Sequence, residues 1–199
     1  MNQNQMFSEM TGAALARLAG RDPAALARAA GVSWDPAALT VESLGVRYTL
    51  ALPDYRCRPE MEPWQYLVVL HHLDLADGTP VSDRLCTFGA LKDGLIRGGG
   101  FDRTSAEALA RLLHGLEPDR LRRAVSALGG REIQTNADFT ARLPFLPRIP
   151  LVLKAWYADE DFPASGKLLL TESADRYLTI EDAVTVGEVT LEKLKQALE

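Results

Sequence analysis

The sequence predicts a single domain of the α+β class, in which helices pack on a mainly antiparallel sheet. Residues 46–52 alternate between apolar and polar side chains, as in a strand with one buried face. Residues 64–73 are apolar almost all round, which is typical of a central, buried helix. Residues 151–157 form an apolar run that follows three closely spaced prolines and is expected to be a second buried strand.

Length and composition indicate one globular domain spanning residues 1–199, with a helical N-terminal extension at 1–38 and a core at 39–199. The chain is 47% hydrophobic and 25% charged, within the usual globular range. Its 22 basic and 27 acidic residues give a net charge of -5, the wrong sign for attraction to nucleic acid or an anionic membrane. No secretory signal or membrane-spanning run is recognisable, so we expect a soluble cytoplasmic protein.

The N-terminal third predicts two short helices followed by a β-hairpin. The helices are expected at 13–18 and 24–30, and Gly31 supplies the stop for the second. Residues 25–33 resemble the core of a DNA-binding helix-turn-helix, but Pro36 interrupts the place of the reading helix, so an ordinary helix and turn is favoured. Strands at 39–43 and 46–52 then form the hairpin.

The middle of the chain predicts three helices and a glycine-rich loop. Glu62-Pro63 opens the buried helix, and Glu117-Pro118 opens another that runs to residue 128. Thr104 and Glu107 form a capping box at the start of the third helix, whose apolar stripe follows at residues 109–116. Residues 84–101 are interpreted as a surface loop with one strand near 85–88. Within this loop, Arg97 and its three following glycines favour a flexible turn over an anion site.

The C-terminal third predicts two strands and an amphipathic helix. Pro144, Pro147 and Pro150 exclude a helix before the strand at 151–157, and a turn leads to a second strand at 167–171. The helix after Thr179 carries an apolar face through residues 180–198, with Gly187 as a weak point. If this face were exposed, it would serve self-association.

The segment 156–163 carries the densest chemistry in the sequence, because three carboxylates lie between aromatic residues at a strand end. Such a place binds a ligand or holds a carboxyl for acid-base chemistry, although it can equally be a solvated turn. One histidine of the apolar helix is expected beside it. The candidate ligand-binding residues are Trp156, Tyr157, Asp159, Glu160, Phe162 and His71.

Metal and nucleophile motifs are not recognisable. Cys57 and Cys86 are 29 residues apart and belong to no paired-cysteine motif, so two free thiols and no metal site are expected. His71 and His72 have no second ligand at helical spacing. Ser165-Gly166 lacks the nucleophile elbow of serine hydrolases, and the sequence indicates no particular cofactor.

The C-terminal part combines a proline-punctuated entry to a tryptophan strand, an acidic turn, Phe162-Pro163-Ala164, and a second apolar strand, and a weaker pattern begins at Leu70-His71. By these features, about the last two-thirds of the chain resembles an uncharacterised prokaryotic family, the domain of unknown function 3786. The resemblance implies an association with anaerobic bacteria and archaea and, loosely, with corrinoid and one-carbon metabolism. Some relatives carry an iron-sulfur segment that this chain lacks, and Leu170-Thr171 stands here where the family tends to have Phe-Asp. It supplies no catalytic residues.

Three functions therefore remain open. The leading one is a non-catalytic binding or accessory module for anaerobic redox or corrinoid metabolism, whose partner is a redox protein, a corrinoid protein or a small molecule. The alternative is an enzyme that uses Glu160 or Asp159 as a general acid or base with the help of His71. The third is a structural subunit that forms an oligomer through the C-terminal helix.

Overall fold

The computed structural model describes residues 3–199 and confirms the α+β class, with two antiparallel sheets rather than the single sheet expected. The helices are α1 (Gln3–Leu18), α2 (Pro23–Ala30), α3 (Pro63–Leu75), α4 (Arg97–Leu113), α5 (Pro118–Ala127) and α6 (Ile180–Leu198), with short 3-10 turns η1 (Phe88–Ala90) and η2 (Glu172–Arg176). The first sheet has the order β1 (Ser33–Asp35), β2 (Ala38–Ser43), β3 (Val46–Ala51), β4 (Arg56–Arg58). The second has the order β5 (Leu85–Cys86), β9 (Ser165–Thr171), β8 (Ile149–Trp156), β7 (Phe139–Leu146), β6 (Arg131–Glu132).

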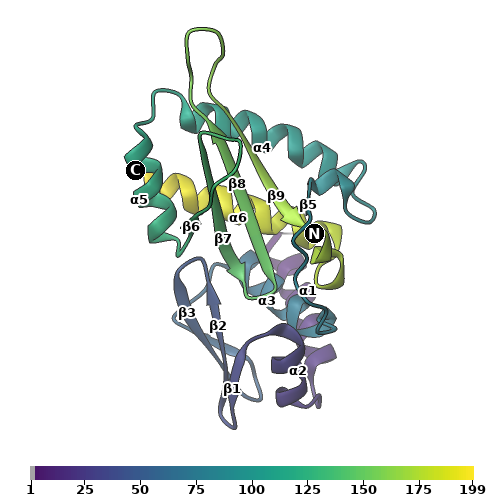
Figure 1. Ribbon diagram of the computed structural model, residues 1–199. Coiled ribbons are helices and arrows are strands. Elements are labelled where there is room, and N and C mark those ends of the chain that lie inside the picture. Colours follow the sequence, from purple (N-terminus) through teal and green to yellow (C-terminus); the bar gives the residue numbers. More distant parts are fainter. Residues whose placement is uncertain (1–2) are drawn as a thin grey trace.

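The two sheets and the helices share one continuous core of buried side chains. Helices α4 and α6 lie behind the five-stranded sheet, and α1, α2 and α3 lie beside its lower end, next to the four-stranded sheet (Figure 1). The sheets meet where β2 approaches β7, and there the Leu44 amide donates to the Pro144 carbonyl at 2.9 Å. Two small sheets therefore act as one folded unit.

The N-terminal expectations are largely confirmed. Asp22 caps α2 by accepting from the amides of Ala24 and Ala25, and Gly31 closes it with a φ of 72°. The hairpin of β2 and β3 forms as expected. Residues 33–35, where a DNA-reading helix would follow, instead form strand β1.

The prolines of the C-terminal third exclude a helix, as expected, but they lie inside a hairpin and not before it. Residues 139–146 form strand β7, which was not expected from the sequence. Pro144 faces Pro150 across the β7 and β8 pair, next to an irregularity in the register. A proline is tolerated in a strand where its missing amide would not enter the ladder.

The expected capping box at Thr104 is wrong, since α4 begins seven residues earlier, at Arg97. The Thr104 hydroxyl lies within the helix and donates to the carbonyls of Gly100 and Phe101. The glycine triplet is therefore helical and not a loop. One of its members has a packing role, because a Cβ on Gly98 would lie 2.2 Å from the Phe88 carbonyl oxygen.

Helix α6 continues through the expected weak point at Gly187. A Cβ there would lie 2.3 Å from the ring of Phe101, which itself packs on Phe88 with ring centroids 4.6 Å apart. Gly187 thus allows α6 to cross close to α4. The apolar stripe of α6 is used in this packing, and Val184, Leu194 and Leu198 are buried. The exposed stripe that self-association through α6 would need is absent from the described structure.

Substitution of the first and the third glycine of the triplet 98–100 should change stability in opposite directions. Gly98→Ala should lower the free energy of unfolding by about 1–3 kcal/mol, because the new methyl group meets backbone atoms that cannot move aside. Gly100→Ala should raise it by about 0.5–1 kcal/mol, because its Cβ would meet nothing within 4 Å and alanine favours the helix. Chemical denaturation of both variants checks this. A loss of stability in Gly100→Ala would contradict the packing described.

The buried histidine of α3 should make stability depend on pH. His72 contacts the Ala30 carbonyl through Nε2 at 3.1 Å, and burial lowers its pKa from 6.5 to about 4. The unfolded chain takes up this proton below pH 6.5 while the folded chain does not, so stability is complete above pH 6.5 and falls toward pH 4. From pH 7 to pH 5 the loss should be about 2 kcal/mol. Denaturation curves of wild type and of His72→Gln measure it, and His114→Gln, at an exposed site, should retain the full dependence.

Candidate functional site

The acidic segment expected to form a site lies at the tip of the hairpin of β8 and β9, which projects from the body of the protein (Figure 1). Oδ1 of Asp159 accepts from the amides of Asp161 and Phe162 at 2.9 and 2.7 Å. This carboxylate therefore shapes the turn. Glu160 is exposed, and the Phe162 side chain is 71% exposed.

The aromatic residues before this turn are half buried at the end of β8. The Tyr157 amide donates to Asp138 at 2.8 Å, and its hydroxyl is buried without a hydrogen-bond partner. Burial raises the pKa of this hydroxyl. Trp156 pairs with Ser165 across the hairpin. These contacts are those of a strand end that packs on the core.

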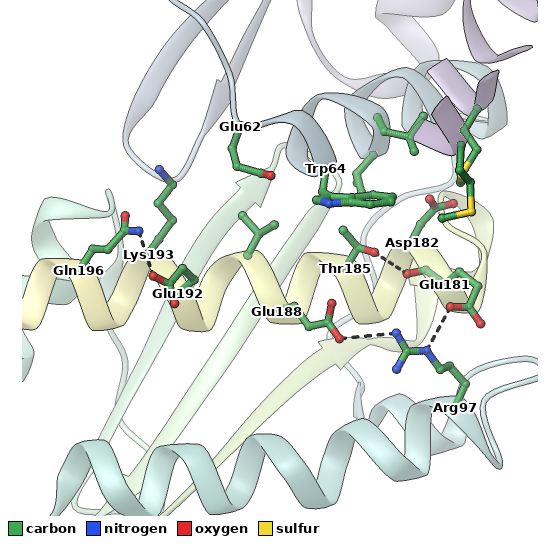
Figure 2. Close-up of a pocket in the computed structure, with 15 residues that line it drawn as sticks. Glu62, Trp64, Arg97, Glu181, Asp182, Thr185, Glu188, Glu192, Lys193 and Gln196 are labelled. Atoms are coloured by element: carbon green, nitrogen blue, oxygen red, sulfur yellow. Dashed lines mark hydrogen bonds and ion pairs between the residues drawn. The ribbon is translucent and has the colours of Figure 1, made fainter. Parts of the chain in front are cut away.

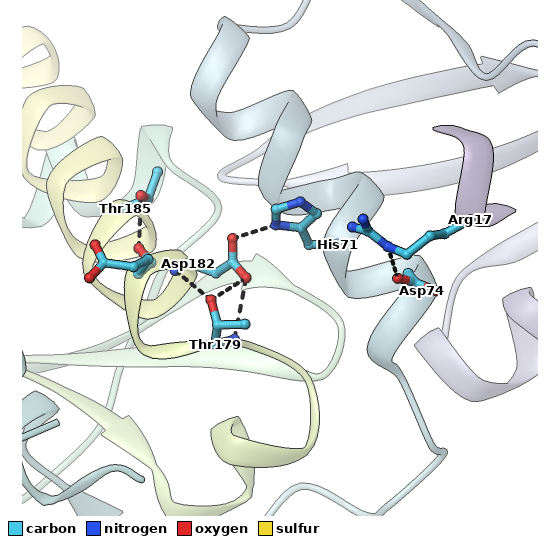
Figure 3. A network of polar contacts seen from close by, with 7 residues as sticks. Arg17, His71, Asp74, Thr179, Asp182 and Thr185 are labelled. Carbon is cyan, nitrogen blue, oxygen red and sulfur yellow. Dashed lines mark hydrogen bonds and ion pairs between the residues drawn. The ribbon is translucent and has the colours of Figure 1, made fainter. Parts of the chain in front are cut away.

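His71 lies away from the turn and contacts a different carboxylate. Helix α3 is found at the opposite end of the sheet from the hairpin tip (Figure 1). The Nδ1 atom of His71 lies 2.7 Å from Oδ1 of Asp182, at the start of α6 (Figure 3). The structure therefore does not bring His71 together with Trp156–Phe162.

Asp182 is the most extensively bonded carboxylate at this junction of helices. Its side chain is 7% exposed, and its Oδ2 accepts from the amide and the hydroxyl of Thr179 at 3.2 and 2.7 Å. The Thr179 hydroxyl in turn accepts from the Asp182 amide, which completes a capping box. Because a carboxylate accepts hydrogen bonds and donates none, Nδ1 of His71 is the donor in its contact with Asp182.

A groove opens beside this junction, between α1, α3 and α6, with a volume of about 660 Å³. Its floor and one end are apolar, formed by Leu67, Val68 and Val189 together with the exposed side chains of two methionines and the half-buried Trp64. The rim is polar (Figure 2). The lining residues are Met6, Met10, Glu62, Trp64, Leu67, Val68, Arg97, Glu181, Asp182, Thr185, Glu188, Val189, Glu192, Lys193 and Gln196.

Negative charge predominates on the rim. Arg97 reaches from α4 to Glu181 and Glu188 of α6, with nitrogen-oxygen distances of 3.1 and 3.5 Å (Figure 2). Glu62 caps α3 by accepting from the Gln65 amide at 2.7 Å. Five carboxylates thus face two basic groups around the groove. An apolar floor with a charged rim is the usual composition of a binding site.

The two thiols take no part in this groove. Cys57 lies on β4 and Cys86 on β5, in different sheets, and both are free. Burial, together with the nearby carboxylates of Asp175, Glu172 and Asp102, raises the pKa of Cys86 to about 11, and burial raises that of Cys57. Both thiols are therefore protonated at neutral pH and are weak nucleophiles. In residues 3–199, no three His, Cys, Asp or Glu side chains gather as a metal site.

The sequence contained part of the signal for the groove. Glu181, Glu188 and Glu192 follow one another at helical spacing, a pattern that indicates a shared polar face of α6. The other walls required knowledge of which helices are neighbours. Arg97 had been interpreted as part of a loop, and Trp64 as part of a buried run.

Two single substitutions should show that the buried carboxylate of Asp182 contributes to stability and that the exposed carboxylate of Glu160 does not. Asp182→Ala should lower the free energy of unfolding by about 1–3 kcal/mol, because the partly buried donors of Thr179 and His71 lose their acceptor. Glu160→Gln should change it by less than about 0.5 kcal/mol. Thermal denaturation at neutral pH measures both. A large effect of Glu160→Gln would show that the hairpin tip has an unrecognised structural role.

Comparison with known proteins gives a family and no activity. No helix in the part of the chain that the structure describes is long and apolar enough to cross a membrane. No curated protein and no solved structure matches the chain. A family profile, described as Domain of unknown function (DUF3786), matches residues 22–193, which include α3 and most of α6. The chain therefore belongs to this family of unknown function.

Proposed function

We propose that the protein is a non-catalytic binding module, which holds a basic, apolar segment of a partner protein in the groove between α1, α3 and α6. The observation that carries this proposal is the combination of an apolar floor with a mainly acidic rim in a groove of about 660 Å³. The acidic hairpin tip supports no such role, because its carboxylates face solvent or the turn itself.

The dimensions of the groove favour an elongated occupant. Its volume lies within the roughly 300–1,000 Å³ that is typical of ligand sites. The wall formed by α6 extends from Glu181 to Gln196, which corresponds to about 22 Å of helix axis. A groove of this length between helices suits an amphipathic helix, whose apolar side chains enter at intervals of one turn.

The side chains of the floor suit an apolar partner surface. Met6 and Met10 are exposed on one face of α1, and methionine adapts to different partner shapes because it is unbranched and polarizable. Trp64 is held in place by Phe7, whose ring lies 5.4 Å away in an edge-on arrangement. A tryptophan beside carboxylates also favours a cationic side chain of the partner.

The rim selects the charge of the partner. Arg97 is occupied by Glu181 and Glu188, so the remaining carboxylates of Glu62 and Glu192 face only Lys193 among the basic residues that line the groove. A partner that brings lysine or arginine gains complementary charge there, whereas an acidic partner is repelled. The expected occupant is therefore basic as well as apolar.

The family resemblance supplies the cellular setting of the proposal. We expect a prokaryotic cytoplasmic protein of anaerobic metabolism, whose partner is a redox or corrinoid protein that presents the basic segment. Relatives with an added iron-sulfur segment would carry a redox centre that this chain would find on its partner. A small corrinoid or redox metabolite is the alternative occupant.

The test is a calorimetric titration, in which an amphipathic helical peptide of leucine and lysine is added to the protein and the dissociation constant is measured. Trp64→Ala should weaken binding by about tenfold, because a central aromatic contact is lost. The double variant Glu188→Gln and Glu192→Gln should weaken it by about fivefold, since exposed ion pairs contribute about 0.5 kcal/mol each. Affinity should fall as salt is raised.

Matched variants in the hairpin of β8 and β9, far from the groove, serve as controls. Trp156→Ala removes the same side chain elsewhere, and the double variant Glu160→Gln with Asp161→Asn changes net charge equally. Both should bind the peptide as wild type does. Equal loss in groove and control variants would mean that the peptide responds only to net charge, and the proposal would fail. A metabolite or corrinoid that shifts thermal stability in all but the groove variants would replace the peptide-like occupant.

A further inference from the structure

The helices around the groove run in defined directions, which gives its two ends different surroundings. His71, near the end of α3, contacts Asp182 at the start of α6 (Figure 3). Glu62, at the start of α3, lies on the side of Glu192 in the groove (Figure 2). Trp64 lies nearer to Asp182 in the same view. Helix α3 is therefore antiparallel to α6, and positions along one helix can be matched to positions along the other.

Two carboxylates face the groove at the same level near one end. Glu62 precedes His71 by nine residues, and nine residues along α6 from Asp182 lead to Leu191, next to Glu192. Both helices advance by about 1.5 Å per residue. Glu62 and Glu192 therefore stand on opposite walls at nearly the same distance along the groove.

The carboxylates at this end keep their negative charge. Glu62 accepts from the Gln65 amide at 2.7 Å and Glu192 accepts from the side chain of Gln196 at 3.1 Å, and both donors are neutral. Lys193 also lines this end, but in the described part of the chain no ion pair joins it to either carboxylate. A cationic side chain of a partner therefore finds two acceptors there.

The exposed apolar side chains gather toward the other end. Helix α1 is parallel to α3, because the ring of Phe7 lies 5.4 Å from that of Trp64 and Arg17 contacts Asp74. Met10 follows Phe7 by about one turn, so it lies beyond Trp64 in the direction of the start of α6. An apolar partner surface fits this end best.

We infer that the groove binds its partner helix in one direction, antiparallel to α6. A basic N-terminal half of the partner lies between Glu62 and Glu192, and an apolar C-terminal half lies against Met10 and Trp64. The inference rests on the proposed function, because it specifies the partner of the same groove. The order of the partner's side chains follows from the free charge of one end and the apolar surface of the other.

The backbone of the partner favours the same direction. The first amides of a helix carry positive partial charge, and its last carbonyls carry negative partial charge. An antiparallel partner brings its first amides to Glu62 and Glu192 and its last carbonyls toward Arg97, whereas a parallel partner makes neither contact. Arg97 already bridges Glu181 and Glu188, so these two carboxylates attract a cation of the partner less than the unpaired ones do.

Two peptides of identical composition test the direction by calorimetry. Both are amphipathic helices of about 15 residues, the length of the groove, with leucine at the apolar positions and blocked ends. The first has lysine at the polar positions of its N-terminal half and glutamine at those of its C-terminal half, and the second has the reverse sequence. Wild type should bind the first about fivefold more tightly, because only this peptide makes the charge and helix-end contacts together.

Two double variants locate the preference in the groove. Glu62→Gln with Glu192→Gln should lower the ratio of the two affinities below about two, and the glutamine oxygen at position 62 can still cap α3. Glu181→Gln with Glu188→Gln removes the same charge from the other end and should keep the ratio or raise it. Differences in helicity between the peptides affect every protein equally, so they cancel when ratios are compared. An equal loss of the ratio in both double variants would overturn the direction.

Tryptophan fluorescence reports the direction independently. A nitroxide on the last residue of the first peptide should quench Trp64, whereas one on its first residue should not. Loss of the quenching in Trp64→Phe assigns the signal to this side chain. Equal affinity of wild type for both peptides, or equal quenching from both ends, would overturn the direction and leave the proposed function standing. A wild type that binds neither peptide would overturn the proposed function and the direction with it.

Discussion

The buried carboxylate of Asp182 fixes the relation between the two helices on which the groove depends. It closes the first turn of α6 through Thr179, and it fixes α3 through His71. Because α3 and α6 form two walls of the groove, their spacing follows from this contact and from the apolar packing below it. A buried carboxylate is costly unless all its oxygens are bonded, and here both are.

A second polar contact positions α1, which forms the third wall of the groove. Asp74 near the end of α3 accepts from Arg17 at 2.6 Å and from Arg21 at 2.7 Å, which attaches α1 alongside α3. Phe7 against Trp64 fixes the other end of the same pair of helices. Helix α1 precedes the residues that match the family, so the methionine wall lies outside the matched region, whereas α3 and most of α6 lie within it.

Local signals predicted the elements of this fold, and the errors came where a distant contact decided the conformation. Asp22, Gly31 and Pro63 were interpreted correctly because caps and first-turn prolines act within a few residues. The triplet that begins at Gly98 was interpreted as a loop, although it is helical. Glycine is required at position 98 because of the close Phe88 carbonyl, which lies ten residues away in the sequence. For the site, His71 was expected beside Trp156–Phe162, but the side chain that it contacts, Asp182, is 111 residues distant and on a different helix.

The polar side of α6 is free to serve binding because the fold does not depend on it. Its apolar residues are buried against α3, α4 and α5, and they supply the packing energy of the helix. The exposed carboxylates at Glu181, Glu188 and Glu192 contribute little to stability, since exposed ion pairs are worth about 0–1 kcal/mol. These carboxylates surround an apolar groove and are not required for stability. Binding of a partner in the groove therefore explains their arrangement better than folding does.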